Sequence, residues 1–575
     1  MQQGLREHNE QERQNRINLK GDKQMEEFRV NKGLVKIALI VLTLTLCVPI
    51  YSHATEIDFG NSDITARFNN TIKYSVAARV RKLDEDVSAT NYNPNIDAGD
   101  HNFDRGLISN RFDLLSEFDL KYKRKYGLRL SAAAWYDFVY NDETDSDLVI
   151  PNALSVDNDE FTKDTEKLHG RKAEMLDYFV FGSFRPLNKR LSMKVGQFAQ
   201  LYGETLFFGA NGVAAAQATP DIIKLLSVPN SQFKEILRPV EQISANLQLS
   251  SKVSLGAYYQ FEWERARLPG AGSYFSFADF ADEGGEVVFF PDIFTGGPAP
   301  LVLLRGDDIE GRNSGQGGVQ LKIRHGDAEY GFYATRHHDK TPQFYFRPVE
   351  PLVGQSSYAL VYAQDIETYG FSVSTLVGET NIAAELSYRR NTPLLATGNV
   401  VLDFAGNGDG RHNPLYPVGE TWHLNVSAIS VLAASPLWDG ASFIGELAMN
   451  YRDHIEKNAD QLDPNATRSA TAVRFIFQPE YFQVMPGTDI QVPIGVGYGI
   501  EGRSSVLGAG AMPPEHGGDV SLGVKADFRK IWQAGLNYTH YFGDASGVVD
   551  PTGALSYDQF HRDRDFISFS VQRTF

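Results

Sequence analysis

The sequence predicts an all-β fold: a transmembrane antiparallel β-barrel of about eighteen strands, with long extracellular loops partly folded over or into the lumen. Three observations predict this class. An apolar leader near the N-terminus indicates export, long runs from Ile64 onward alternate apolar and polar residues, and the chain ends on a strand-like segment with a terminal aromatic residue. The mean hydropathy of -0.30 excludes a bundle of membrane helices.

Residues 1–54 are predicted to be a signal peptide, and residues 55–575 the mature barrel. A basic segment precedes an apolar segment at 34–50, and Ser-His-Ala at 52–54 places small residues before the expected cut. A start at Met25 would give a leader of ordinary length. The alternative is that residues 1–24 are a genuine extension. The single cysteine lies inside this leader, so the mature chain is expected to contain no disulfide.

The strands are predicted from alternation of period two. In residues 111–122 the even positions are mostly apolar and most odd positions are charged, which directs the two sets to opposite faces of a strand. The runs span roughly 9–15 residues, longer than the mode of about 5–6 in globular proteins, so we expect membrane-spanning strands instead of a soluble sandwich. The predicted strands are 64–80, 110–122, 127–140, 175–185, 190–199, 241–249, 252–265, 317–324, 328–338, 366–377, 381–390, 421–433, 441–452, 469–478, 489–501, 518–528, 531–542 and 565–575.

The connections between these strands alternate between short turns and long polar loops, as outer-membrane barrels require. Short turns are expected near 124, 187, 251, 326, 379, 437, 483 and 529, and the other connections are long. An even strand number places both termini on the periplasmic side. Aromatic residues near the run ends predict interfacial girdles: Tyr122, Tyr140, Tyr178, Trp263, Trp422, Tyr451 and Trp532.

The last strand carries a signal of its own. Ile567, Phe569, Val571 and the terminal Phe575 share one face, although Arg573 interrupts this apolar row. A strand ending in a C-terminal aromatic resembles the signal read by the barrel-assembly machinery, which we therefore expect as a partner through Phe575. The alternative is an ordinary final strand.

Two long loops contain more apolar residues than solvated loops need. Loop 203–240 includes Thr219-Pro220-Asp221, which predicts a helix start, and loop 268–316 is rich in aromatic and aliphatic residues. A barrel of this circumference would leave an aqueous channel unless something fills it. We expect loop 203–240 to fold inward as a plug and loop 268–316 to pack in the mouth or around an apolar ligand. The alternative is a loop packed on the outer rim.

Charged residues on the polar strand faces and in loop 203–240 are the candidates for lining and gating the lumen. The alternative for the strand residues is a wall of mutual salt bridges. The candidates are Arg111, Asp113, Arg129, Asp137, Glu204, Asp221, Lys224, Lys234, Glu235, Arg238, Glu262, Glu385 and Arg389.

Several sequence blocks in combination resemble a family of proteobacterial outer-membrane proteins catalogued as domain of unknown function 1302. The resemblance covers essentially the whole mature chain. It implies an outer-membrane barrel of a Gram-negative bacterium, and the transport and lipid-metabolism genes near family members imply handling of hydrophobic compounds. The blocks include Asp97–Asp100, Gly106–Arg111, Ala134–Asp137, Gly203–Thr205, Asn211-Gly212, Gly272–Phe275 and Glu385–Arg389.

Other chemistry finds little support in the sequence. Acidic loops at 142–147, 157–160 and 407–409 could bind calcium, although none matches the helix-flanked calcium loop, and the alternative is solvated acidic loops. His423, Asn425 and Ser427 share a strand face, but His423 and Ser427 would lie roughly 13 Å apart, beyond the reach of a base and its nucleophile. With a formal charge of -17 and no basic tract, the chain is not expected to bind nucleic acid.

Three functions are carried forward. The first is an outer-membrane channel or transport barrel for a small hydrophobic molecule. The second is a non-catalytic outer-membrane partner of an envelope transport complex, and the third, least favoured, is an outer-membrane hydrolase; we expect no enzyme activity and no cofactor. The expected partners are outer-membrane lipids and lipopolysaccharide, the barrel-assembly machinery and envelope transport proteins. The sequence does not identify the substrate, the direction of transport or the oligomeric state.

Overall fold

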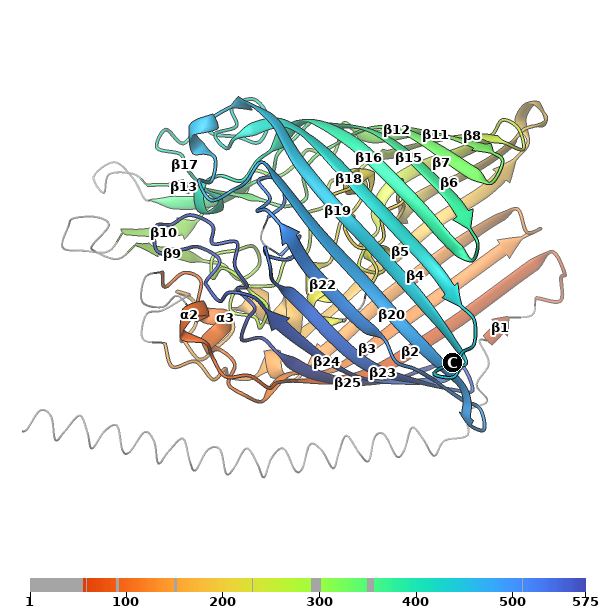
Figure 1. The fold of residues 1–575 in the computed structure, drawn as a ribbon, viewed down its shortest axis with the longest axis horizontal. Coiled ribbons are helices and arrows are strands. Elements are labelled where there is room, and N and C mark those ends of the chain that lie inside the picture. The colour runs from red at the N-terminus through yellow and green to blue at the C-terminus, as the bar shows by residue number, and fades with distance from the viewer. Residues whose placement is uncertain are drawn as a thin grey trace, which may run out of the picture. The chain divides into compact units, whose positions relative to one another are not determined.

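The computed structural model describes residues 55–57, 59–88, 93–148, 153–229, 231–290, 301–348, 356–508 and 510–575. The predicted signal peptide, with its start at Met25, lies outside the described residues. Residues 55–575 form an antiparallel β-barrel whose strands run obliquely around a central lumen (Figure 1). The fold class predicted from the sequence is confirmed.

The barrel wall has eighteen strands, because β21 and β22 together form one strand that is interrupted at residues 492–493. All eighteen predicted strands are present, with ends that shift by a few residues. They are β2 (Ile64–Arg79), β3 (Leu107–Tyr122), β4 (Tyr126–Asp137), β5 (Arg171–Phe184), β6 (Arg190–Phe198), β7 (Val240–Gln248), β8 (Val253–Gln260), β11 (Gln316–His325), β12 (Ala328–His337), β15 (Ile366–Val377), β16 (Thr380–Pro393), β18 (Val418–Leu432), β19 (Gly440–Lys457), β20 (Ser469–Met485), β21 (Thr488–Gln491) with β22 (Ile494–Glu501), β23 (Gly518–Phe528), β24 (Trp532–Phe542) and β25 (Phe566–Thr574).

The barrel closes where the last strand pairs with the first long one. β25 pairs antiparallel with residues 71–79 of β2, and Phe575 extends this pairing through two backbone hydrogen bonds with Asn70, of 2.8 and 2.9 Å. The short strand β1 (Thr55–Ile57) then pairs with residues 66–68 of β2. The edge of β2 is therefore covered by residues 55–57 and by the C-terminal strand, which removes the free sheet edge that a membrane does not tolerate.

The two ends of the barrel differ as the sequence predicts. One end carries the short turns, several of which use residues with positive φ, such as Lys123 and Arg124 or Arg529 and Lys530. The long connections gather at the other end, on the left of Figure 1, while β1 and the C-terminus lie on the turn side. Both termini of the mature chain therefore share the side that the even strand number predicts.

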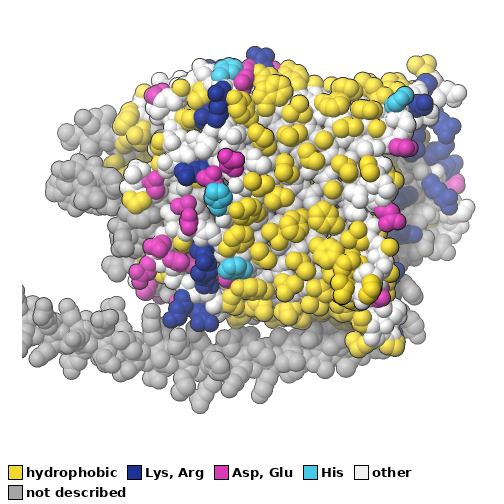
Figure 2. Space-filling view, viewed as in Figure 1, with side chains coloured by type: hydrophobic (Ala, Val, Ile, Leu, Met, Phe, Trp, Pro, Cys, Tyr) yellow, Lys and Arg dark blue, Asp and Glu magenta, His cyan; other side chains and the backbone are white. Residues whose placement is uncertain are grey.

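The outer surface of the wall is apolar. Leu114, Val180, Leu522 and Leu536 are between 41% and 54% exposed although they belong to well-paired strands. Figure 2 shows hydrophobic side chains covering the middle of this face, with charged and histidine side chains toward the loop side. Such a band is typical of a barrel surrounded by lipid.

Two residues predicted for the aromatic girdles have a different position. Tyr140 and Trp263 are each only 6% exposed, because both follow the end of their strand and pack inside the loop region. Trp422 and Tyr122, by contrast, are 41% and 43% exposed on the wall, as expected for girdle residues.

A second, five-stranded sheet lies within the long loops and was not predicted. Its strands are short and largely apolar, so they lack the alternation that identifies the wall strands. They pair across loops distant in sequence, with β13 parallel to β17 and β10 parallel to β14. The strands are β9 (Val287–Phe290), β10 (Leu301–Arg305), β13 (Gln343–Arg347), β14 (Ser357–Val361) and β17 (Val400–Leu402).

The helical segments are short and lie mostly in the long loops. None of the helices within the described residues is long and apolar enough to cross a membrane. They are α2 (Glu85–Ser88), α3 (Ala98–His101), α4 (Lys163–Thr165) and α5 (Ile222–Ser227), with η1 (Val139–Asn141), η2 (Glu166–Gly170), η3 (Pro186–Asn188), η4 (Val213–Ala216), η5 (Phe233–Glu235), η6 (Thr397–Asn399) and η7 (Ala459–Gln461).

Candidate functional site: the inward loop and two adjoining cavities

The connection between β6 and β7, residues 199–239 and here called the inward loop, folds into the barrel and docks on two buried carboxylates of the wall. Glu446 of β19 accepts the backbone N–H groups of Leu206, Phe207 and Phe208, at 3.1 Å for Leu206 and 2.9 Å for Phe208. Glu385 of β16 accepts further backbone N–H groups of the loop, as described below. A carboxylate that receives backbone N–H groups makes charge-assisted hydrogen bonds, so the wall fixes the loop firmly.

Glu385 and Arg389 hold the next part of the loop. Glu385 accepts the N–H groups of Glu204 and Val213 at 2.7 and 2.6 Å. Arg389 donates to the carbonyl oxygen of Gly212 at 2.7 Å. Gly212 allows this close approach, because a Cβ at that position would lie 2.6 Å from a Glu385 carboxylate oxygen.

Asn211 is a fully buried polar residue of the inward loop. Its side-chain oxygen lies 3.0 Å from Nδ1 of His423, and its amide nitrogen donates to Oδ1 of Asn425 at 3.0 Å. The other ring nitrogen of His423 lies 2.9 Å from the hydroxyl of Thr421, and the hydroxyl of Ser427 donates to a loop carbonyl. The three polar residues considered for hydrolysis are therefore engaged in docking the loop.

The helix of the inward loop begins two residues later than the sequence suggested. Asp221, not Thr219, caps α5, because its carboxylate accepts the N–H of Lys224 at 3.0 Å. Pro220 pairs with Leu237 in an isolated bridge instead of occupying the first helical turn. Asp221 also forms a 2.9 Å ion pair with Arg267, which ties the inward loop to the neighbouring loop.

The remaining charged candidates of the inward loop have local roles. The Lys224 ammonium donates to the carbonyl oxygen of Glu235 at 2.6 Å, and the Glu235 carboxylate accepts the N–H of Gln232. Burial lowers the pKa of Lys224, and the nearby Lys73 lowers it further. Lys234 is exposed, and Arg238 pairs with Glu264 at 3.5 Å.

Glu204 links the inward loop to a third part of the wall. Its carboxylate lies 3.4 Å from the ammonium of Lys322 on β11. Burial raises the pKa of Glu204, and Lys322 partly offsets this effect. Glu262, beyond the end of β8, has its pKa raised by burial and by the neighbouring carboxylates of Glu264 and Glu241.

The candidates Arg111, Asp113 and Arg129 on β3 and β4 form ion pairs within the wall, which is the alternative to a role in gating. Arg111 pairs with Asp113 at 2.7 Å, and Arg129 pairs with Asp119 and Asp177 at 3.0 and 3.2 Å. The buried Asp137 accepts the N–H groups of Asn110 and Val139, each at 3.0 Å, and thereby closes the end of β4. Among the predicted residues, Glu204, Asp221, Arg238, Glu385 and Arg389 join the inward loop to the structure around it.

The long loops enclose an apolar cavity of about 510 Å³, here called the outer cavity. The five-stranded sheet provides much of its lining, and α5 of the inward loop contributes Leu225 and Leu226. The polar sites in this lining are few, which is typical of a pocket for an apolar ligand. The sheet contributes Val288, Phe289 and Phe290 of β9, Gln343, Phe344 and Phe346 of β13, and Val400 and Leu402 of β17 to this lining.

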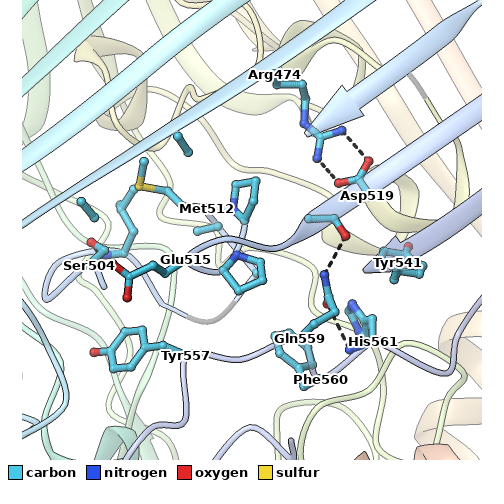
Figure 3. Close-up of a pocket in the computed structure, with 18 of the residues that line it drawn as sticks. Arg474, Ser504, Met512, Glu515, Asp519, Tyr541, Tyr557, Gln559, Phe560 and His561 are labelled. Atoms are coloured by element: carbon cyan, nitrogen blue, oxygen red, sulfur yellow. Dashed lines mark hydrogen bonds and ion pairs between the residues drawn. The ribbon is translucent and has the colours of Figure 1, made fainter. Parts of the chain in front are cut away.

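A smaller cavity of about 170 Å³, here called the inner cavity, lies between the inward loop and the wall formed by β20, β23 and β24. Phe207, Phe208 and Leu226 line it from the loop side. Figure 3 shows its polar side, where Arg474 and Asp519 face each other in a paired arrangement. The lumen thus contains two compartments of different polarity on either side of α5.

A buried ion network supports the loops around these cavities, and sequence reasoning missed it. Arg564 pairs with Asp100 and Asp563, and Asp563 also pairs with Arg79 of β2; all these side chains are at most 4% exposed. The network joins the segment before β25 to the loop after β2. The signal in the sequence is the charged run at 562–565 directly before an apolar strand.

The acidic loops predicted as calcium sites use their carboxylates for turns and pairs. Asp409 accepts the N–H groups of Arg411, His412 and Asn413, and Asp147 lies 3.1 Å from His101. Within the described ranges, the acidic and histidine side chains that converge as a group are Glu420, His454 and Glu456, on other strands. Calcium binding by the loops stays a prediction.

Comparison with known proteins identifies a family. The family model described as "Protein of unknown function (DUF1302)" matches residues 35–575. No curated protein matches the chain. Similar solved structures include OccAB4 of Acinetobacter baumannii (9% identity, 91% of this chain and 100% of that chain, TM-score 0.40) and OccAB2 of the same organism (8%, 89% and 98%, 0.42). OccD3 (OpdP) of Pseudomonas aeruginosa is also similar (9%, 91% and 93%, 0.38).

Proposed function

The chain belongs to the DUF1302 family of proteins of unknown function, and from this premise we propose that it is an outer-membrane conduit for a small hydrophobic molecule. The outer cavity carries the proposal. Its volume of about 510 Å³ suits a drug-sized or lipid-sized apolar ligand, and its lining is mostly apolar, with polar side chains such as Asn95 and Gln343 among the aromatic and aliphatic ones. The apolar band on the outer wall and the predicted signal peptide support a location in the outer membrane of a Gram-negative bacterium.

The inward loop would act as the gate of this conduit. It occupies the lumen beneath the outer cavity, and α5 contributes Leu225 and Leu226 to the linings of both cavities. Docking through hydrogen bonds to wall carboxylates leaves the loop a separate element that can move without breaking the barrel. A molecule bound in the outer cavity would then pass only when α5 and its neighbours shift.

Binding of an apolar fluorophore tests the proposal. The purified barrel in nanodiscs should bind N-phenyl-1-naphthylamine, and Phe290→Gln should weaken this binding several-fold, because Phe290 lines the outer cavity. The matched control is Phe404→Gln, since Phe404 is 70% exposed and lies outside the lining. Equal affinity of the two variants would overturn the assignment of the outer cavity.

The alternative function is a non-catalytic outer-membrane partner of an envelope transport complex. A barrel that binds no apolar probe and conducts no ions, even with the inward loop shortened, would favour this alternative. Hydrolysis of ester or phospholipid substrates by the purified barrel would instead support a hydrolase.

A further inference from the structure

The outer and inner cavities adjoin, so a single ligand could occupy both. Their linings share residues of α5 and of the loop between β24 and β25. The shared residues include Leu225, Leu226, Val548, Leu555, Phe560 and His561, and the loop between β22 and β23 contributes three more.

In the wall next to the inner cavity, strand β22 has no side chains at its buried positions. The inward positions of β22 are 495, 497 and 499, and all three are glycine. Arg474 and Asp519 flank Gly497 in the sheet register and pair across it, with Nη1 of Arg474 3.0 Å from Asp519 Oδ2 (Figure 3). A Cβ at Gly497 would lie 2.4 Å from the Arg474 guanidinium, so glycine leaves room for the ion pair.

The cationic groups of the inner cavity are already neutralised. Arg474 pairs with Asp519, and Arg503 pairs with Glu515 at 3.3 Å. The remaining charged lining residue is the acidic Asp558. An anionic ligand end would therefore meet no unpaired cation among the described lining residues, and its desolvation would be uncompensated.

Three buried polar atoms of the inner cavity have no hydrogen-bond partner within the described part of the chain. They are Oγ1 of Thr539, the hydroxyl of Tyr557 and Nε2 of His561. Burial lowers the pKa of His561 to about 3, so the imidazole is neutral, and its Nε2 accepts or donates one hydrogen bond according to the tautomer. Buried polar atoms in native proteins are normally paired, so these three point to a polar group that the cavity receives.

We propose that the two cavities together bind an uncharged amphiphile, with its apolar body in the outer cavity and a hydroxyl-bearing end in the inner cavity. The inference rests on the proposed function and adds the chemical class of the substrate. A ligand hydroxyl both donates and accepts, so it can pair with any one of these three atoms. A plain hydrocarbon would leave all three atoms unpaired.

Displacement of N-phenyl-1-naphthylamine from the full barrel in nanodiscs tests this specificity. The competitors are dodecan-1-ol, dodecanoate, dodecylammonium and dodecane, which share one chain length and differ at the end. We expect dodecan-1-ol to displace the fluorophore about tenfold better than the others, once their partition into the lipid has been subtracted with empty nanodiscs.

Variants of nearly the same size as the natural side chains test which residues cause the preference for dodecan-1-ol. Thr539→Val and Tyr557→Phe should each bring dodecan-1-ol several-fold closer to dodecane, when both competitors are referred to the affinity of that variant for the fluorophore. The control is Thr375→Val, because Thr375 bonds to the Asp327 carbonyl at the turn end of the barrel. His561→Phe supplies a third variant that removes the acceptor and keeps an aromatic ring.

The outcomes separate this inference from the proposed function. A barrel that binds no fluorophore overturns both. Fluorophore binding with equal displacement by dodecan-1-ol and dodecane overturns the amphiphile inference alone. Strongest displacement by dodecylammonium or dodecanoate also overturns it, since a charged end would then be preferred.

Discussion

Glu446 is the single side chain on which the position of the inward loop depends most directly. It accepts three consecutive backbone N–H groups of the loop and an amide hydrogen of Asn425. Replacement by alanine leaves these donors unpaired, and hydrogen bonds to a charged group contribute about 1.5–3 kcal/mol each. We predict that Glu446→Ala loosens the loop, so that a cysteine at the fully buried position Ala214 reacts faster with a water-soluble thiol reagent.

The matched control for this change is Asp177→Ala. Asp177 is also a wall carboxylate, but it pairs with Arg129 on another part of the barrel and has no contact with the loop among its hydrogen bonds and ion pairs within the described residues. Its loss should leave the labelling rate at position 214 unchanged. Equal rates in the two variants would mean that Glu446 does not hold the loop.

At the residue scale, the sequence indicated which side chains face the lumen but not what they contact. Glu385 and Arg389 were predicted as lumen residues from parity, and the structure places both against the inward loop. The role of Asn211 could not be predicted, because it depends on which loop reaches which strand. Lys234 and Glu235 are charged, like the residues that dock the loop, but they do not dock it. Lys234 is exposed, and Glu235 accepts the N–H of Gln232 in its own turn.

At the scale of elements, β25 closes the barrel through its pairing with β2. We predict that deletion of Phe575 lowers the folded, heat-modifiable fraction, because the two backbone hydrogen bonds with Asn70 at the seam are lost. Phe575→Ala keeps these bonds and removes only the ring, so comparison of the two variants separates seam pairing from recognition of the terminal aromatic. Normal insertion of the shortened chain would contradict both roles.

The alternation of β23 gives a second prediction for an element. Leu522 is 51% exposed on the apolar outer face, whereas Lys525 lies at a position of opposite parity. In the cysteine-free mature barrel reconstituted in lipid, a membrane-impermeant thiol reagent should label Lys525→Cys and leave Leu522→Cys largely unlabelled. Equal labelling would show that the register of the strand is wrong.

The wall strands could be predicted and the inner elements could not, for a physical reason. A wall strand has lipid on one side and the lumen on the other, which imposes alternation on its own sequence. β13 and β14 are buried on both faces, so their sequences are mostly apolar. The start of α5 was misplaced because Thr219 and Asp221 are both good capping residues, and tertiary contacts of Pro220 select the second.

At the scale of the whole molecule, the outer cavity is assembled from loops that are far apart in the sequence. Its lining extends from the loop after β2 to the segment before β25. The many apolar residues of loop 268–316 predict that this loop is buried. In the structure they form two strands of the five-stranded sheet and part of the lining of the outer cavity. Neither the volume of the cavity nor its position next to α5 could be obtained from local patterns.

The central claim is that the inward loop closes an otherwise open barrel, and single-channel conductance tests it most directly. Residues 209–233 can be replaced by a short Gly/Ser bridge, because the N–H of Phe233 already bonds to the carbonyl of Leu206 at 2.8 Å and the cut ends lie close together. Residues 206–208 keep their bonds to Glu446, so the barrel should stay folded, as heat modifiability would verify. We predict a severalfold rise in conductance over the intact protein. Unchanged conductance in a correctly folded deletion would contradict the claim and assign the closure of the lumen to another loop.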